Sequence, residues 1–266
     1  MVDGQTHSDV HSVLSTQYSV LTKVTVLTPI HNETANIPEL VERIEKTMKA
    51  WRAQKEGRDW EHVACDDHST DGSLELLQKL AAAHPRLRPV QNPRRSGQTG
   101  GFDTGFRQAR GDIIVTMDAD LQNLPEDIPL LVAPLEEGKL DLCNAIRTKR
   151  QHAGSLIAIS KLGNVLIRLL MVCPVSDAAS NFTALRSSFV RNLTLVENDH
   201  RYLIPILVRR GLDPRRVGEV PTRHEARKHG ASKYSALRKA TTGFPELLRC
   251  KKRLKAGFYD KPVKPQ

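Results

Sequence analysis

The chain has 266 residues, of which 39% are hydrophobic and 26% are charged, and its formal net charge is +10. This length and hydrophobic content allow a sizeable buried core and exclude an intrinsically disordered chain. The excess of positive charge predicts anionic partners, among them nucleic acid, a phospholipid surface or a phosphate-bearing small molecule.

The first 22 residues predict a flexible lead-in rather than a secretory signal, because no apolar core follows a basic start. No uninterrupted apolar run in the sequence reaches the roughly 18 residues that a membrane-spanning helix needs. The four cysteines lie far apart and form no CxxC pair, which indicates a reducing, cytosolic setting.

Strands alternate with helices from residue 23 onward. Apolar and β-branched runs predict strands at residues 23–30, 61–65, 87–91 and 112–117. Apolar residues at helical spacing predict helices at residues 37–51, 73–83, 97–109 and 125–136. This alternation is typical of an α/β fold with a mainly parallel sheet flanked by helices, whose ligands bind beyond the carboxyl ends of the strands.

The second half of the chain has a less regular pattern. A strand, an amphipathic segment, a polar segment, a helix and a strand are expected at residues 139–145, 155–173, 176–183, 202–210 and 216–220. The amphipathic segment is open to two interpretations, a core or interface helix and a membrane-surface helix. Residues 23–235 are expected to form one large domain, and residues 236–266 a basic arm that faces a membrane.

Two aspartates, Asp118 and Asp120, directly follow an apolar strand. Ionised carboxylates are costly to bury unless a cation compensates them, and Mg²⁺ or Mn²⁺ prefers such oxygen ligands. The spacing therefore indicates a metal site. A pair of carboxylates that caps the helix expected near Pro125 is the alternative.

Residues 66–72, DDHSTDG, follow another predicted strand. Asp66 and Asp67 either accept hydrogen bonds from a base or ribose, or form an Asx turn and cap the helix expected at residue 73. The glycines Gly97, Gly100 and Gly101 do not match the GxGxxG dinucleotide pattern, so they are expected to let a helix begin close to a binding pocket.

Five motifs in order resemble the family 2 glycosyltransferases. They are TPIHNE, DDHSTDG, a glycine-rich stretch, DADLQ and HEARKHGASKY, at residues 28–33, 66–72, 97–105, 118–122 and 224–234. The block is most similar to the polyprenyl-phosphate branch, which includes dolichyl-phosphate mannose synthase and the bacterial undecaprenyl-phosphate sugar transferases. The resemblance implies a GT-A, Rossmann-like fold with amphipathic, basic interface helices towards the C-terminus.

The resemblance also implies roles for single residues. The nucleotide-sugar pocket is implied to comprise Pro29, Asn32, Glu33, Asp66, Asp67 and Gly97, with Asp67 as the principal base reader. The metal and diphosphate site is implied to comprise Asp118, Asp120 and Gln122. The cations expected to contact phosphates are Arg147, Arg227 and Lys233.

The implied reaction is an inverting transfer of a sugar from a UDP- or GDP-sugar to dolichyl or undecaprenyl phosphate. Bound Mg²⁺ or Mn²⁺ would stabilise the charge that develops on the departing diphosphate. A phosphate acceptor is already anionic near neutral pH, so a dedicated general base is not required. The enzyme is expected at the cytoplasmic face of a membrane, either as a peripheral protein or as a chain whose anchor is missing.

Two other functions remain open. A hydroxyl acceptor would need a carboxylate base, for which Asp199 is the candidate, although Asp199 is also read as the N-cap of the helix before Tyr202. Asp177 is similarly read as an acceptor-site residue or as a turn residue. A nucleic-acid-binding protein is disfavoured, because only 5% of the residues are aromatic and no binding motif is present.

Overall fold

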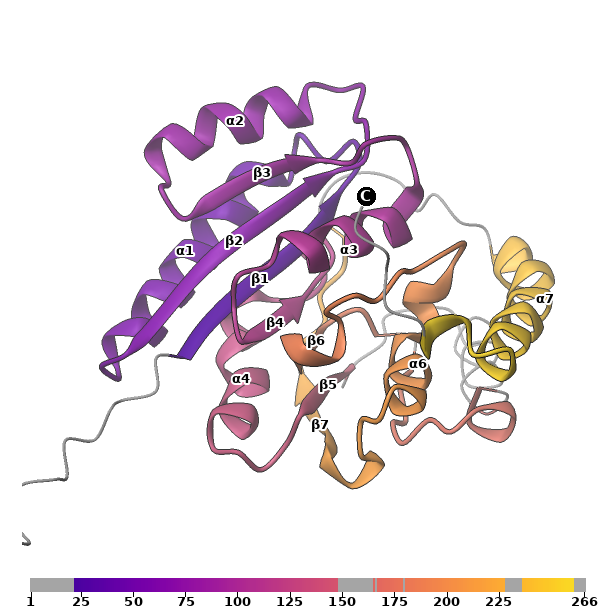
Figure 1. Ribbon diagram of the computed structural model, residues 1–266. Coiled ribbons are helices and arrows are strands. Elements are labelled where there is room, and N and C mark those ends of the chain that lie inside the picture. The colour runs from indigo at the N-terminus through magenta and orange to yellow at the C-terminus, as the bar shows by residue number, and fades with distance from the viewer. Residues whose placement is uncertain (1–21, 148–164, 166, 179, 228–235, 261–266) are drawn as a thin grey trace, which may run out of the picture.

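The computed structural model describes residues 22–147, 165, 167–178, 180–227 and 236–260. Within them lies a seven-stranded sheet of order β3-β2-β1-β4-β6-β5-β7 (Figure 1). Its strands are β1 Thr22–Ile30, β2 Arg58–Asp66, β3 Leu87–Gln91, β4 Ile113–Thr116, β5 Leu142–Arg147, β6 Thr183–Arg186 and β7 Val217–Thr222. All of these strands except β6 run in the same direction, and β6 is antiparallel to both neighbours, β4 and β5.

Helices cover both faces of the sheet. The α-helices are α1 Ile37–Ala53, α2 Ser73–Ala83, α3 Gly97–Gln108, α4 Ile128–Glu136, α6 Leu203–Arg209 and α7 Ala236–Lys255. Short 3₁₀ turns are η1 Pro125–Asp127, η2 Ser187–Phe189, η3 Asp199–Tyr202, η4 Pro214–Arg216 and η5 Phe258–Asp260. Helices α1, α2 and α4 pack on one face and α3, α6 and α7 on the other, which gives three layers (Figure 1).

The period-two geometry of the strands sends alternate side chains to the two faces. In β4, Ile113 and Val115 join the core under α1 and α4, whereas Ile114 joins the core under α3 and α6. All three are completely buried. Such continuous apolar strands are expected where a sheet is covered on both faces.

The structure confirms the α/β fold with its mainly parallel sheet, and the first four strand-helix pairs lie where the sequence predicts them. Strand β6 is not predicted. It lies at the end of a segment expected to be a polar connection, and it inserts between β4 and β5, with Leu185 opposite both Ile114 and Leu142.

Helix α7 is amphipathic, as expected for the C-terminal arm. Leu247 and Cys250 are buried in the core under α6, whereas Phe244 and Leu248 are exposed. Most of the amphipathic segment at 155–173 lies outside the described residues, but its end packs into the same core through Ile167 and Met171.

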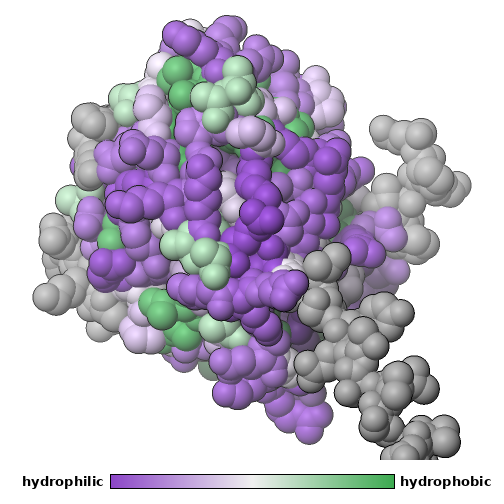
Figure 2. All heavy atoms as spheres, turned by 90° about the vertical axis from the view of Figure 1, so that its left-hand side faces the viewer, coloured by the Kyte–Doolittle hydropathy of each residue, from purple (hydrophilic) through white to green (hydrophobic). Residues whose placement is uncertain are grey.

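In the part of the chain that the structure describes, no helix has both the length and the hydropathy needed to cross a bilayer. The side of the molecule that carries α1 is mostly hydrophilic, with hydrophobic residues in small separate patches (Figure 2).

The turn before β4 approaches β1 very closely at Gly111. A Cβ atom on Gly111 would lie 2.6 Å from the main-chain nitrogen of Thr25, which cannot move without disturbing β1. We therefore expect Gly111→Ala to lower the free energy of unfolding by about 1–3 kcal/mol. Gly243→Ala is the control, because its Cβ meets no atom within 4 Å and alanine favours a helix. Urea unfolding of both variants measures the difference, and equal stability would contradict the close approach.

Candidate functional site

The loops that follow the parallel strands meet at one edge of the sheet. The loop after β1 is joined to the loop after β2, because Asn32 Oδ1 accepts from the main-chain N–H of Thr70 at 2.8 Å and Ser73 Oγ accepts from the N–H of Glu33 at 3.0 Å. Asn32 has a φ of +56°, in the left-handed region that asparagine tolerates. Polar side chains of several strands therefore gather at the place where α/β sheets bind ligands.

Asp118 follows β4 and is held by two amides. Its Oδ1 accepts a hydrogen bond from Gln98 Nε2 at 2.6 Å and another from Asn181 Nδ2 at 3.1 Å. Gln98 lies in the first turn of α3, and Asn181 lies just before β6. Neither amide is predicted from the sequence as a partner of Asp118. Only the shared edge of the sheet brings them together.

Asp120 is held by a cation. Its Oδ2 accepts from Arg227 Nη2 at 2.6 Å, and its Oδ1 accepts from the main-chain N–H of Gln122 at 3.1 Å. The chain turns between the two acids and Gln122, with Leu121 at a φ of +58°. The helix-cap alternative for the two aspartates is wrong, because η1 is preceded by Leu124 and neither η1 nor α4 has a side-chain cap.

The two aspartates influence each other electrostatically. Burial and the neighbouring charge of Asp120 raise the pKa of Asp118 to about 6, although the two amides and the charge of Arg147 oppose this. The carboxylate pair therefore lies in a place that favours an additional positive charge.

The donor chemistry of this site fits a hard divalent cation. Magnesium and manganese need few protein carboxylates when substrate phosphates complete the coordination. Asp118 and Asp120 supply carboxylate oxygens, and Gln122 donates from Nε2 to the carbonyl of Glu225 at 3.4 Å, so that its amide oxygen is the atom suited to a metal. Among the described residues, no group of three or more His, Cys, Asp or Glu side chains could hold a metal alone.

Asp67 holds the loop between β3 and α3 in place. Its Oδ1 accepts from Ser96 N and Asn92 Nδ2 at 2.7 and 2.8 Å, and its Oδ2 accepts from Gly97 N at 2.7 Å. Both oxygens thus hold the N-terminus of α3, where Gly97 has a φ of +68°. This role of Asp67 is not predicted from the sequence.

Asp66 presents a different environment. It is completely buried, and its Oδ2 accepts from the N–H of Ser69 at 3.2 Å, three residues further on. The expected Asx turn and helix cap are not formed by Asp66 or Asp67, because Asp71 accepts from the N–H of Ser73 and Gly72 is the N-cap residue of α2. The Oδ1 of Asp66 has no hydrogen-bond partner among the described residues. An unpaired buried acceptor is costly, so this oxygen is suited to an N–H donor of a ligand. Pro29 packs nearby, since a Cβ on Gly101 would lie 2.8 Å from its Cβ.

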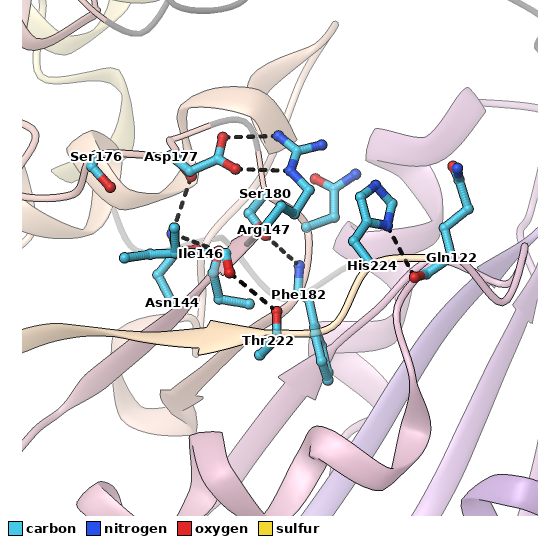
Figure 3. Close-up of polar contacts among 12 residues, drawn as sticks. Gln122, Asn144, Ile146, Arg147, Ser176, Asp177, Ser180, Phe182, Thr222 and His224 are labelled. Atoms are coloured by element: carbon cyan, nitrogen blue, oxygen red, sulfur yellow. Dashed lines mark hydrogen bonds and ion pairs between the residues drawn. The ribbon is translucent and has the colours of Figure 1, made fainter. Parts of the chain in front are cut away.

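Arg147 leaves the end of β5 and forms a two-pronged ion pair with Asp177, with both distances 2.8 Å (Figure 3). Asn144 Nδ2 donates to the carbonyl of Asp177 at 3.0 Å, and Glu219 accepts from the N–H of Ser176 at 2.9 Å. Asp177 also forms the expected turn, because its carbonyl accepts from the N–H of Ser180 at 3.1 Å. The guanidinium of Arg147 is therefore fixed in orientation beside Asp118.

Asp199 takes neither of the roles expected for it. The N-cap residue of η3 is Asn198 and that of α6 is Tyr202. Asp199 is completely buried, and its two oxygens accept from Arg253 Nη2 at 2.5 Å, Tyr259 Oη at 2.8 Å and Val196 N at 2.9 Å. It anchors α7 and η5, and both of its oxygens are already occupied by these protein donors. The expectation that Asp199 serves as a general base is therefore wrong.

The residue after it, His200, lines a small pocket together with Thr116 and Asn181. Its Nδ1 is 2.7 Å from Thr99 Oγ1 on α3, and burial lowers the pKa of the imidazole to about 3. His200 is thus neutral at physiological pH. Lys233, the last of the expected phosphate contacts, lies outside the described residues.

Comparison with known proteins agrees with this geometry. The model of the family "Glycosyl transferase family 2" matches residues 25–193. Undecaprenyl-phosphate 4-deoxy-4-formamido-L-arabinose transferase of Pseudomonas fluorescens is 35% identical over 229 residues, which are 85% of this chain and 64% of that protein. The enzyme of the same name from Salmonella paratyphi B is 35% identical, over 81% of this chain and 64% of its own length. The chain therefore spans less than two thirds of these relatives.

Two solved structures share the fold. Mannosyl-3-phosphoglycerate synthase from Rubrobacter xylanophilus has a TM-score of 0.68 at 14% identity, over 92% of this chain and 78% of that one. Glucosyl-3-phosphoglycerate synthase from Mycobacterium tuberculosis, in complex with Mn²⁺, UDP-glucose and phosphoglyceric acid, has a TM-score of 0.64 at 19% identity, over 85% and 79%. At these identities the likeness establishes the fold alone.

The buried position of Asp199 makes it a stability determinant. We expect Asp199→Asn to lower the free energy of unfolding by about 2–4 kcal/mol, because Arg253 would lose its charged partner. Asp260→Asn is the control, since its pair with Arg209 is exposed and such pairs contribute roughly 0–1 kcal/mol. Thermal melting measures both. An unchanged melting temperature combined with lost activity would instead indicate a catalytic role for Asp199.

Proposed function

The chain belongs to glycosyl transferase family 2, and we propose that it transfers a sugar, with inversion, from a nucleoside diphosphate sugar to a polyprenyl phosphate. The observation that carries the proposal is the pair Asp118 and Asp120 at the ligand-binding edge of the sheet, with Arg227 and Arg147 beside it. The 35% identity to undecaprenyl-phosphate sugar transferases supports the lipid acceptor.

On the donor side, the proposal assigns the diphosphate to the carboxylate pair. Asp118, Asp120 and the amide of Gln122 would hold Mg²⁺ or Mn²⁺, which when bound supplies positive charge to the departing diphosphate. Asp66 offers a buried oxygen for an N–H of the base, and Asp67 fixes the loop at the start of α3 around it. Uracil and guanine both carry such a donor, so UDP- and GDP-sugars are both accommodated by this chemistry.

On the acceptor side, Arg147 is the cation proposed to orient an attacking phosphate. Asp177 holds two of its nitrogens, so the guanidinium does not need to be ordered when the acceptor binds. A phosphate acceptor needs no base, whereas the base expected for a hydroxyl acceptor, Asp199, is buried against α7 and η5. This contrast favours phosphate as the acceptor.

A lipid acceptor requires contact with a membrane, and α7 has a surface suited to it. Phe244, Leu248 and Lys252 recur four residues apart on one exposed stripe of the helix, and Lys255 lies one turn further on. Phe244 and Leu248 are 49% and 45% exposed. We propose that this stripe rests on the cytoplasmic face of an anionic membrane, where each lysine contributes about 1 kcal/mol.

The transfer reaction can be tested directly. We expect radiolabelled sugar to pass from UDP- or GDP-sugars to undecaprenyl or dolichyl phosphate only when Mg²⁺ or Mn²⁺ is present. Asp118→Asn should reduce kcat by roughly 100-fold or more, because a charge that stabilises the transition state is lost. Asp112→Asn, an exposed acid before the same strand, is the control. Transfer to saccharide hydroxyls with none to lipid phosphate would refute the proposed acceptor.

The membrane contact needs a separate experiment. Phe244→Asp combined with Leu248→Asp should abolish flotation with vesicles that contain 30% anionic phospholipid, since apolar area and charge complementarity are lost together. Leu130→Asp is a matched control, because Leu130 is 51% exposed but lies on α4. If the double variant floats as well as the wild-type protein, α7 is not the membrane-binding surface.

A further inference from the structure

Asp120 and Arg227 form the shortest link between the carboxylate pair and the segment after β7. Their atoms lie 2.6 Å apart, and their side chains are only 8% and 27% exposed. A charge-assisted hydrogen bond of this length in a largely buried place is one of the stronger polar interactions in a protein. A second cation on Oδ2 of Asp120 would share this oxygen with the guanidinium and be repelled by it.

A divalent ion and the guanidinium compete for that oxygen. Magnesium binds carboxylate oxygens at about 2.0–2.1 Å, so an ion on Oδ2 would lie next to a guanidinium nitrogen and repel it. The other oxygen, Oδ1, accepts from the N–H of Gln122. Asp118 faces two neutral amides, Gln98 and Asn181, which can turn away without a charge penalty. The charge of Arg147 also acts on Asp118, but Arg147 is paired with Asp177. Among the described residues, the cation bonded to the carboxylate pair itself is Arg227.

Arg227 remains close to the site when it leaves Asp120. The residues just before Arg227 are fixed to the loop that follows β4. Asn123 and His224 form a β-bridge, and the N–H of Glu225 donates to the carbonyl of Gln122 at 2.9 Å. The displaced guanidinium thus stays within one side chain's length of the carboxylates. A diphosphate is the partner suited to it, because guanidinium binds phosphate oxygens in a two-pronged geometry.

We propose that Arg227 exchanges Asp120 for the donor diphosphate, and that this exchange makes the metal ion and the nucleotide bind cooperatively. The inference rests on the proposed metal-dependent donor site. Alone, the ion must displace Arg227 without compensation. When the diphosphate binds as well, the ion gains phosphate oxygens as ligands, and Arg227 gains a new anionic partner. Because coupling between two ligands is reciprocal, the ion must strengthen nucleotide binding by the same factor.

The free Mn²⁺ signal in electron paramagnetic resonance measures this coupling without any turnover. For the wild-type protein, we expect UDP or GDP, whichever binds, to tighten Mn²⁺ binding by roughly 5- to 100-fold. Arg227→Met should bind Mn²⁺ without nucleotide several-fold more tightly than the wild type, and the effect of the nucleotide should shrink. Arg223→Met is the matched control, because Arg223 lies on the same segment but pairs with Asp127. It should leave Mn²⁺ affinity unchanged.

The outcomes separate this inference from the proposed function. If the wild-type protein binds no Mn²⁺ with either nucleotide, the metal-dependent donor site is wrong. If it binds Mn²⁺ with nucleotide, but Arg227→Met leaves nucleotide-free Mn²⁺ affinity unchanged or weaker, only the exchange is overturned. Arg227→Lys covers the case in which the methionine variant does not fold. It keeps the charge but loses the planar two-pronged geometry, so it should retain weak nucleotide-free Mn²⁺ binding and lose most of the coupling.

Discussion

Two carboxylates at the end of a fully buried strand are the constraint around which the site is organised. Asp118 and Asp120 repel each other, and burial weakens the screening of their charges by solvent. Donors from three distant parts of the chain stabilise the two carboxylates: Gln98 on α3, Asn181 before β6 and Arg227 after β7. Each of these parts reaches the carboxylates because α3 and β6 begin, and β7 ends, at the same edge of the sheet. The electrostatic cost of the pair thus also explains why these segments converge.

Local patterns predict much of this fold. Strands β1 and β4 are largely apolar because both of their faces are covered, and α1 carries one apolar stripe, so these elements are recognisable from their own residues. Strand β6 is the exception. It has only four residues, and it is a strand because β4 and β5 lie on either side of it. Partners far away in the sequence leave no periodic signal in so short a segment.

The site is predictable to a similar extent. Asp118 and Asp120 can be identified because charged residues after a buried strand are unusual, whereas Gln98 and Asn181 are ordinary amides until the fold brings them to Asp118. For Asp199 the sequence predicts a functional role that the structure does not support. An acid beside a helix start resembles a cap or a base, but its partners Arg253 and Tyr259 are 54 and 60 residues downstream. No local pattern reveals such a pairing.

The reversed direction of β6 has a consequence for how such proteins diversify. A parallel strand would have to be entered from the opposite edge of the sheet, but β6 begins at the edge where β5 ends. The connection from Arg147 to Thr183 therefore leaves and re-enters the sheet at the edge that carries the carboxylates. Because loop closure becomes only slowly more costly with length, residues can be added next to the ends of these two strands without a change in strand order. Such an insertion would alter the surface beside Arg147 and leave the loops after β1 and β2 unaltered.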